Sequence, residues 1–340
     1  MDVFQLTRAL IDIPSVTLEE KAVAEYLGAH LREMGAAVEL DEAEPNRPNV
    51  YAAWCEGGGA PDVVLSTHLD TVPPFFASRE DDANIYGRGS CDAKGIVAAQ
   101  VEAARRLRNE GVGDFALLFL VGEERNSAGA AHANLKPRGS RWLVNGEPTE
   151  NRLALGTKGV LRIEIDAHGR MAHSAYPELG ESATEKLLDA LERVRRMKLP
   201  ADPVLGQTTM NIGLLSGGVA PNVIPGSARA ELMYRTVAPT DALLAQITEA
   251  VGAQGTVRKV LEIPPVKLGR IDELGGQVPT DVVKFATDIP CLTNWGQPFL
   301  FGPGSIHVAH TDNEHIPKAQ LAEAVEIYVK MVKLLKARKG

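Results

Sequence analysis

Four short apolar segments constrain the fold of this chain more than any other feature of its sequence. They are residues 49–55, 62–67, 115–121 and 142–145. The last three are apolar at nearly every position, as strands covered on both faces of a sheet usually are. A helix of about 18 residues is predicted to begin near Asp92 and to end at Gly111. Strands that alternate with helices predict an α/β sheet that is mixed but mostly parallel and is flanked by helices.

Two further helices are predicted ahead of this sheet. The amphipathic start, MDVFQLTRALIDIP, forms the first, and the second runs from Thr17 to Gly35. Thr17 and Glu20 have the spacing of a capping box, and Gly35 supplies the end of the helix. One apolar stripe on this helix consists of Val23, Leu27, Leu31 and Met34.

The pattern changes after about residue 157. Strand-like and helical segments then follow in the order β-α-β-β-α-β, which is typical of a self-contained, two-layer, ferredoxin-like α+β unit. The strands are 160–166, 208–215, 227–236 and 256–263, and the helices are 182–197 and 240–251. The α/β character resumes near Asp281 and closes with an amphipathic helix over 318–336. We therefore predict one domain from residues 1–157 and 266–340, and a second domain, 158–265, inserted into it.

Charge and composition exclude several classes of function. The net charge of −8 leaves no basic stripe for a nucleic acid. No apolar run approaches the roughly 18–20 residues of a membrane helix. The N-terminus lacks the pattern of a signal peptide. The three cysteines, Cys55, Cys91 and Cys291, are few, odd in number and far apart in the sequence, which disfavours a disulfide framework. Together these observations lead us to expect a cytoplasmic protein.

Chemically active side chains follow three of the predicted strands at the point where each strand ends. They are His68, the pair Glu123 and Glu124, and Glu147. Because α/β sheets bind ligands beyond the carboxyl ends of their strands, we expect these side chains to lie close together. Each has an ordinary explanation when taken alone, namely a surface histidine or a solvated acidic turn.

Two more residues complete a possible metal site. Asp92 lies at the predicted start of a helix, where it is either a simple cap or a carboxylate that bridges two metals. His310 lies in a glycine-rich segment near the C-terminus. The combined set has the nitrogen and oxygen ligands expected for zinc or a similar divalent ion. It comprises His68, Asp92, Glu124, Glu147 and His310.

Two acidic residues beside these ligands suggest supporting roles. Asp70 stands two residues after His68 and could accept the second N–H of its imidazole. Glu123 and Glu124 are adjacent and therefore point in different directions. One of them can bind metal while its neighbour faces the substrate as a general base.

At this point the sequence resembles a known family, the M20 metallopeptidases and deacylases. The resemblance covers nearly the whole chain. The matching motifs are HLDTVP (68–73), YGRGSCDAKG (86–95), GEE (122–124), GEPT (146–149), MAHSAYP (171–177), GGVAPNVIP (217–225) and FGPGSIHVAHTDNEHI (301–316).

The resemblance implies a role for each matched position in the site. His68 and Glu147 would hold one metal, Glu124 and His310 would hold the other, and Asp92 would bridge both. Asp70 would orient His68, and Glu123 would be the general base. The family often has a non-prolyl cis peptide after the bridging aspartate, which here is the bond from Asp92 to Ala93.

The resemblance also implies that the inserted domain is a lid that forms a homodimer. His173 would reach the active site of the partner subunit and help to stabilise the oxyanion. Asn222 and Arg235 would grip a substrate carboxylate, although Arg235 could also be an exposed strand arginine. The loop from Gly302 to Gly304 would contact the α-carboxylate of the substrate.

The implied activity is that of a two-zinc amidohydrolase, with Co²⁺ as a possible substitute. We expect it to remove an N-acetyl group from a small amino acid, as acetylornithine and acetyl-lysine deacetylases do in amino-acid biosynthesis. A carboxypeptidase or dipeptidase is the alternative, and a non-catalytic relative is disfavoured because every ligand position is filled. The sequence departs from the family at Gly122, where relatives often carry Asp or Thr, and in the short segment between Pro73 and Tyr86.

Overall fold

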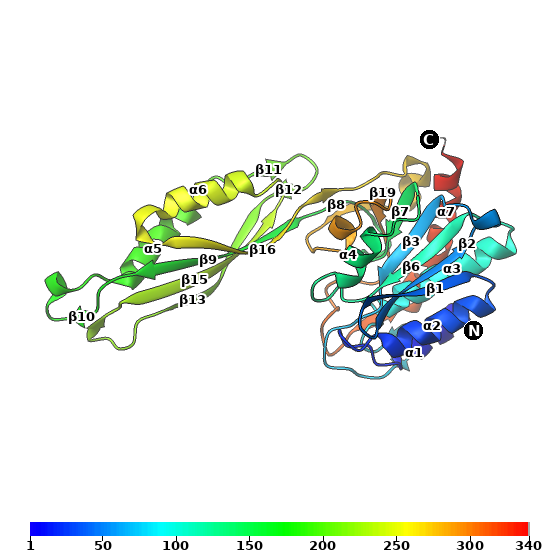
Figure 1. Ribbon diagram of the computed structural model, residues 1–340, viewed down its shortest axis with the longest axis horizontal. Coiled ribbons are helices and arrows are strands. Elements are labelled where there is room, and N and C mark those ends of the chain that lie inside the picture. The colour runs from blue at the N-terminus through cyan, green and yellow to red at the C-terminus, as the bar shows by residue number, and fades with distance from the viewer. Residues whose placement is uncertain (339–340) are drawn as a thin grey trace. The chain divides into compact units, whose positions relative to one another are not determined.

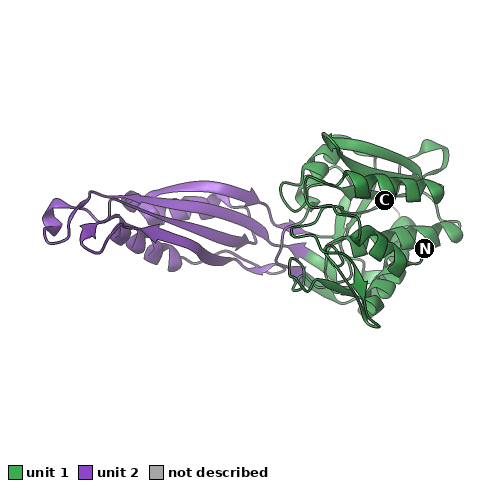
Figure 2. Ribbon diagram, turned by 90° about the horizontal axis from the view of Figure 1, so that it is seen from below, with its two compact units in different colours: residues 1–155, 268–281, 287–340 green, residues 156–267, 282–286 purple. Residues whose placement is uncertain are grey.

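A computed structural model describes residues 1–338 of the chain, which divide into two compact units (Figure 2). The first unit contains Met1–Leu155, Leu268–Asp281 and the chain from Thr287 onward. The second contains Gly156–Lys267 and Val282–Ala286. The segment 282–286 therefore belongs with the second unit, whereas the sequence pattern had assigned it to the first domain.

The first unit is built on a mixed sheet, as predicted. Its strand order is β1-β2-β6-β3-β7-β19-β8-β17, and β18 (Thr280–Val283) also pairs with β8. The strands are β1 (Ala37–Glu44), β2 (Arg47–Trp54), β3 (Val63–His68), β6 (Phe115–Leu120), β7 (Trp142–Asn145), β8 (Leu153–Thr157), β17 (Val266–Lys267) and β19 (Gln297–Leu300). The four central strands, β6, β3, β7 and β19, are parallel to one another, whereas β2 is antiparallel to β6 and β8 is antiparallel to β19. The outer pairs β1–β2 and β8–β17 are also antiparallel.

Helices cover both faces of this sheet (Figure 1). They are α1 (Val3–Ile11), α2 (Lys21–Glu33), α3 (Lys94–Asn109), α4 (Ala128–Asn134) and α7 (Lys318–Ala337). Phe115, Leu117 and Phe119 of β6 join the large core with α1, α2, α3 and α7, while Ala116, Leu118 and Leu120 pack on the opposite face with α4. Because both faces are covered, every residue of β6 is buried, which explains its continuous apolar sequence.

The predicted capping box at the start of α2 is wrong. The helix begins at Lys21, and Glu20 stands at its N-cap without a side-chain capping bond. The Thr17 hydroxyl instead donates to Oδ2 of Asp70 at 2.8 Å. Glu20 is fully buried and accepts from the guanidinium of Arg47. Both members of the expected box are thus engaged by residues far away in the sequence.

A small three-stranded sheet, which the sequence did not suggest, joins two loops of the first unit. Its order is β20-β5-β4, with β4 at Arg79–Glu80, β5 at Asn84–Tyr86 and β20 at His315–Pro317. It brings the segment just before Arg88 beside the segment just after His310.

The second unit has the predicted β-α-β-β-α-β order. Four antiparallel strands lie in the order β13-β15-β9-β16, and α5 and α6 pack against their apolar face. The elements are β9 (Gly159–His168), α5 (Ala183–Arg195), β13 (Thr209–Gly217), β15 (Ser227–Thr236), α6 (Asp241–Val251) and β16 (Thr256–Ile263). Two short antiparallel pairs accompany them, β10 (Ala172–His173) with β14 (Val223–Ile224), and β11 (Ala201–Asp202) with β12 (Gly206–Gln207).

Within residues 1–338, none of the helices is both long enough and apolar enough to cross a bilayer.

Candidate metal centre

Three parallel strands deliver the first side chains of the site. The strands β3, β6 and β7 are neighbours, and their carboxyl ends therefore meet at one edge of the sheet. His68 is the last residue of β3, and Glu124 and Glu147 follow the ends of β6 and β7. Ligand atoms of His68, Asp92 and Glu124 all lie within 4.8 Å of one another, a grouping that could hold a metal ion.

Asp92 lies between two imidazoles. Its Oδ1 is 2.9 Å from Nε2 of His68, and its Oδ2 is 3.3 Å from Nε2 of His310. The alternative that Asp92 is only a helix cap is excluded, because Ala93 occupies the N-cap of α3 and the Asp92 side chain faces the histidines. The expected cis peptide between Asp92 and Ala93 is present.

His310 is brought to the same place from the opposite end of the chain. Its Nε2 lies 3.0 Å from Oε1 of Glu124. These contacts with Asp92 and Glu124 raise the pKa of the His310 imidazole to about 10, despite its partial burial. Its backbone is in the left-handed region, at φ 62°. His310 and Glu124 are therefore in direct contact.

Glu147 is buried and has a carboxylate oxygen without a protein partner. The side chain is 4 % exposed, and Oε1 has no hydrogen bond to the described residues. Burial raises the pKa of Glu147 well above its usual value, and the nearby charge of Glu123 raises it further. A buried, unpaired carboxylate is costly unless a cation is supplied. The donor set and this free oxygen therefore fit divalent metal ions.

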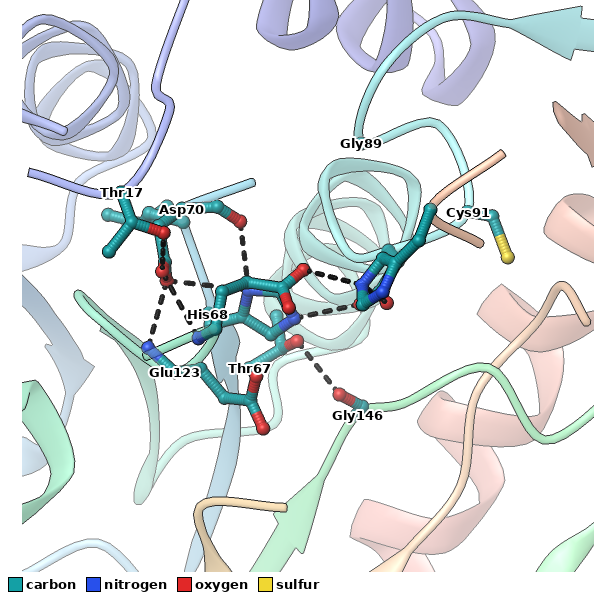
Figure 3. Close-up of polar contacts among 12 residues, drawn as sticks. Thr17, Thr67, His68, Asp70, Gly89, Cys91, Glu123 and Gly146 are labelled. Carbon is teal, nitrogen blue, oxygen red and sulfur yellow. Dashed lines mark hydrogen bonds and ion pairs between the residues drawn. The ribbon is translucent and has the colours of Figure 1, made fainter. Parts of the chain in front are cut away.

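Asp70 orients His68 differently from the prediction. Nδ1 of His68 lies 3.0 Å from the backbone carbonyl oxygen of Asp70 and 3.6 Å from its carboxylate Oδ1. Most of the hydrogen bonds that the Asp70 carboxylate accepts come from the backbone of a turn, as Figure 3 shows. It accepts from the backbone N–H groups of Gly122, Glu123 and Glu124 at 3.0, 3.0 and 3.2 Å. Asp70 thus fixes the strand-end turn that carries the two glutamates.

Glu123 is held by its backbone, while its carboxylate points away from the turn (Figure 3). Burial raises the pKa of this carboxylate well above its usual value, and the charge of Asp288 adds to the effect, while His68 opposes it. A glutamate whose proton affinity is raised in this way suits the transfer of a proton near neutral pH.

The departure at Gly122 has a structural reason. Gly122 has φ +81°, and a Cβ at this position would lie 2.8 Å from Nη2 of Arg47. Arg47 is itself buried and donates through Nε to Glu20 at 2.8 Å. A side chain at residue 122 would therefore require this arginine to shift, in addition to adopting a left-handed backbone conformation.

Two buried acids near the site were missed by the sequence analysis. Asp288 is 1 % exposed, and burial raises its pKa to about 6. It follows no strand and carries no periodic signal. Glu314 is fully buried and contacts Arg88, and although it lies within a matched motif, no role had been assigned to it.

Comparison with known proteins identifies the family. Residues 155–256 match the family described as the peptidase dimerisation domain of M20 proteins. A Schizosaccharomyces pombe protein named Peptidase M20 domain-containing protein C757.05c is 37% identical over 339 residues, covering 97% of this chain and 84% of the relative. The chain belongs to the M20 peptidase family. As an M20 enzyme, it is a hydrolase that acts on amide bonds.

Other M20 relatives carry more specific names. A probable carboxypeptidase of Aspergillus terreus is 39% identical, with 96% of this chain and 84% of the relative covered. Among solved structures, the aminopeptidase PepT of Bacillus cereus has a TM-score of 0.85 at 20% identity, with 98% of each chain covered. The M20 metallo-carboxypeptidase Sso-CP2 of Sulfolobus solfataricus has a TM-score of 0.74 at 16% identity, with 98% of this chain and 99% of that chain covered. At these identities, the structural matches establish the M20 fold.

The remaining candidate residues of this M20 protein do not form one group. His173 and Asn222 lie close together in the second unit, where the N–H of Ser174 donates to the carbonyl oxygen of Asn222 at 3.0 Å. Arg235 pairs with Val160 at the start of β9, whereas His173 follows the other end of that strand. About eight residues of strand, or roughly 25 Å, separate these two ends. Within the second unit, Arg235 is therefore not a neighbour of His173.

Gly302 and Gly304 lie in the first unit, beside Glu147 and Cys91 respectively. A Cβ on Gly302 would lie 2.5 Å from the carbonyl oxygen of Glu147, so only glycine fits there. The N–H groups of both glycines are already used, since that of Gly302 donates to Thr149 Oγ1 and that of Gly304 to Gln320 Oε1, each at 3.0 Å. If this loop contacts a substrate carboxylate, the contact must therefore be made by atoms other than these two N–H groups.

Proposed function

We propose that this M20 hydrolase is a two-metal exopeptidase that releases a terminal residue from a small peptide. The observation that carries the proposal is the Asp92 carboxylate, which offers a different oxygen to His68 and to His310. The names of the curated relatives, which include probable carboxypeptidases at 36–40% identity, support cleavage at the carboxyl end.

Zinc is the metal we propose, with Co²⁺ as a possible substitute, because the ligands are two imidazoles and three carboxylates. His68 and Glu147 would hold one ion, Glu124 and His310 the other, and Asp92 both. When bound, such ions polarise an amide carbonyl and lower the pKa of water. The solved dinuclear metal-binding peptidase YXEP of Bacillus subtilis, an M20 member, has the same fold with a TM-score of 0.73.

Glu123 is the proposed general base. Its carboxylate would take a proton from the attacking water and return it to the departing amine. Asp70 holds the backbone N–H of Glu123 at 3.0 Å and thereby fixes the turn from which this carboxylate projects. The raised pKa of Glu123 favours the second transfer, in which the carboxyl group must still hold the proton.

The second unit, with residues 158–265 as its predicted extent, is proposed to act as a lid and to form a homodimer. The match to a peptidase dimerisation domain over residues 155–256 supports this role. His173 would then serve the site of the partner subunit as an oxyanion donor, with Asn222 and Arg235 as carboxylate contacts. Cys55, Cys91 and Cys291 are free thiols, which supports a reducing, cytoplasmic location.

Removal of an N-acetyl group from a small amino acid is the second candidate. Both reactions break an amide that can lie next to a free carboxylate, and the short loop between Pro73 and Tyr86 favours compact substrates. The two candidates differ only in what lies on the acyl side of the broken bond.

A substrate panel tests the proposal. It contains dipeptides and tripeptides, the same peptides with an amidated C-terminus or an acetylated N-terminus, and the N-acetyl derivatives of ornithine and lysine. A carboxypeptidase will cleave free and N-acetylated peptides and spare the amides. An aminopeptidase will cleave free and amidated peptides and spare the N-acetylated peptides. A deacetylase will cleave only the acetyl amino acids. If the metal-loaded enzyme cleaves only the acetyl amino acids, the exopeptidase proposal is wrong.

A further inference from the structure

Glu314 is a buried carboxylate whose two oxygens face two different groups of donors. Oε1 accepts from the backbone N–H groups of Gly89, Cys91 and Asp92, at 3.0, 3.1 and 3.1 Å. Oε2 accepts from Nη1 of Arg88 at 2.6 Å. Glu314 is 0 % exposed and Arg88 is 1 % exposed. Both buried charges are thus paired and hydrogen-bonded, which offsets the cost of removing them from water.

Arg88 extends this contact to the segment that follows His68. Its Nε donates to the carbonyl oxygen of Pro74 at 3.2 Å, and its backbone N–H donates to the carbonyl oxygen of Phe76 at 3.2 Å. The guanidinium also lies over the ring of Phe76, 5.0 Å from the centroid. The loop from 73 to 76 is therefore tied to Glu314 through one arginine.

Glu314 also belongs to the segment that carries His310. It stands four residues after that histidine, immediately before β20, and its carbonyl oxygen accepts from the N–H of Gly87 at 3.2 Å. The Glu314 carboxylate and its partner Arg88 thus connect three segments of the chain, which carry the proposed ligands His68, Asp92 and His310.

The direction of the Asp92 side chain depends on how its backbone is held. Asp92 must present one oxygen to each of His68 and His310, and the bond from its own N–H to Glu314 fixes the residue at its base. Groups that orient metal ligands in this way commonly change metal affinity by about 10- to 100-fold when they are removed.

We propose that Glu314, together with Arg88, is a positioning residue that aims Asp92 between the two histidines and so sets the affinity for both metals. This inference rests on the proposed two-metal function. Glu314 itself is not a ligand, because its two oxygens are taken by Arg88 and by the backbone N–H groups.

The test compares Glu314→Gln with a matched control in the second unit. The substitution keeps the volume but leaves an amide that cannot accept from Arg88 and from the three N–H groups at once. The control is Glu164→Gln, because Glu164 is also buried and paired with arginines, Arg229 at 3.6 Å and Arg258, but lies in the sheet of the other unit. Each protein is stripped of metal and titrated with Zn²⁺ against a competing chelator. The absorption spectrum with Co²⁺ reports the geometry of the ligands, and thermal unfolding of the metal-free protein reports the fold.

We expect Glu314→Gln to bind Zn²⁺ about 10-fold or more weakly and to shift the Co²⁺ spectrum, whereas Glu164→Gln keeps both properties of the wild type. If Glu314→Gln does not fold, the same measurements on Glu314→Asp test the proposal instead. The aspartate keeps the negative charge, but its shorter side chain cannot extend to all of the same donors. A folded variant at Glu314 with wild-type affinity and spectrum overturns the positioning role. If the wild type binds no metal, the proposed function fails, and if both wild type and variant bind two ions equally, only this inference fails.

Discussion

Oδ1 of Asp92 lies 2.9 Å from Nε2 of His68, and this contact leaves Oδ2 free to face another group. That group is His310, at 3.3 Å, which arrives from the far end of the sequence. A single carboxylate therefore joins two potential metal positions.

Glu123 and Glu124 are adjacent, yet their substitution should have different effects. We expect Glu123→Gln to lower kcat by about 10²- to 10⁴-fold while both metals remain, because only proton transfer is lost. Glu124→Gln should lose metal, since Glu124 lies 3.0 Å from His310 and within the ligand group. Metal analysis and steady-state kinetics on both proteins distinguish the roles. An active Glu123→Gln protein would remove Glu123 from the role of base.

Metal uptake should release protons. Contacts with Asp92 and Glu124 raise the pKa of His310 to about 10 in the metal-free protein, so its imidazole is charged at neutral pH and must lose a proton to bind a metal. Burial also raises the pKa of Glu147, which favours its protonated form in the metal-free protein. Affinity should therefore fall as pH falls. Calorimetry in two buffers with different ionisation enthalpies measures the release at pH 7.5, and we expect at least about one proton per chain.

His310→Asn is the control for this measurement. It should release about one proton fewer than the wild type, because the charged imidazole is absent. Equal proton release by the two proteins would show that His310 is already neutral before metal binds.

Substitution of Gly122 should destabilise the fold through a clash with Arg47. In Gly122→Ala, the new Cβ would lie 2.8 Å from Arg47 Nη2, in addition to the strain of φ +81°. Gly111→Ala is the matched control, because Gly111 has φ +76° but no atom within 4 Å of the new Cβ. The control should cost about 1–2 kcal/mol, and Gly122→Ala more, in chemical unfolding of the metal-free proteins. Equal losses would mean that Arg47 moves away without cost.

Two inactive variants should restore activity when mixed, if His173 serves the partner subunit. His173→Ala and Glu123→Gln are unfolded, mixed and refolded together. Half of the dimers are then mixed, and each contains one intact site, so about a quarter of the wild-type activity is expected. Activity that stays at the level of the separate variants would place His173 in its own chain's site or outside catalysis.

Four strands of the first unit's sheet, β2, β3, β6 and β7, could be predicted from their apolar sequences, and β3 and β6 are buried at every position. The strands β1, β8, β17, β18 and β19 were not predicted. The residues that follow β3, β6 and β7 could then be placed at one edge, and this located His68, Glu124 and Glu147. Asp92 and His310 lie on loops, and they entered the candidate site because their side chains complete a metal-ligand set and lie within the family motifs, not because of periodicity.

Features that depend on contacts distant in the sequence could not be predicted in this way. Thr17 has the local pattern of a helix cap, but its hydroxyl is taken by Asp70, 53 residues later. The strands β4, β5 and β20 are two or three residues long, which is too short for an alternating pattern. Asp288 and Glu314 are buried acids, and sequence alone favours an exposed position for such residues.

The proposal of a two-metal site bridged by Asp92 is tested by the metal content of the wild type and of Asp92→Asn, measured beside peptide hydrolysis before and after chelation. If the proposal holds, we expect about two ions per wild-type chain and loss of hydrolysis on chelation, with recovery on return of Zn²⁺. We also expect a large loss of metal from Asp92→Asn, since the shared ligand serves both positions. A wild type that hydrolyses peptides with no bound metal, or an Asp92→Asn protein that retains both ions, would contradict it.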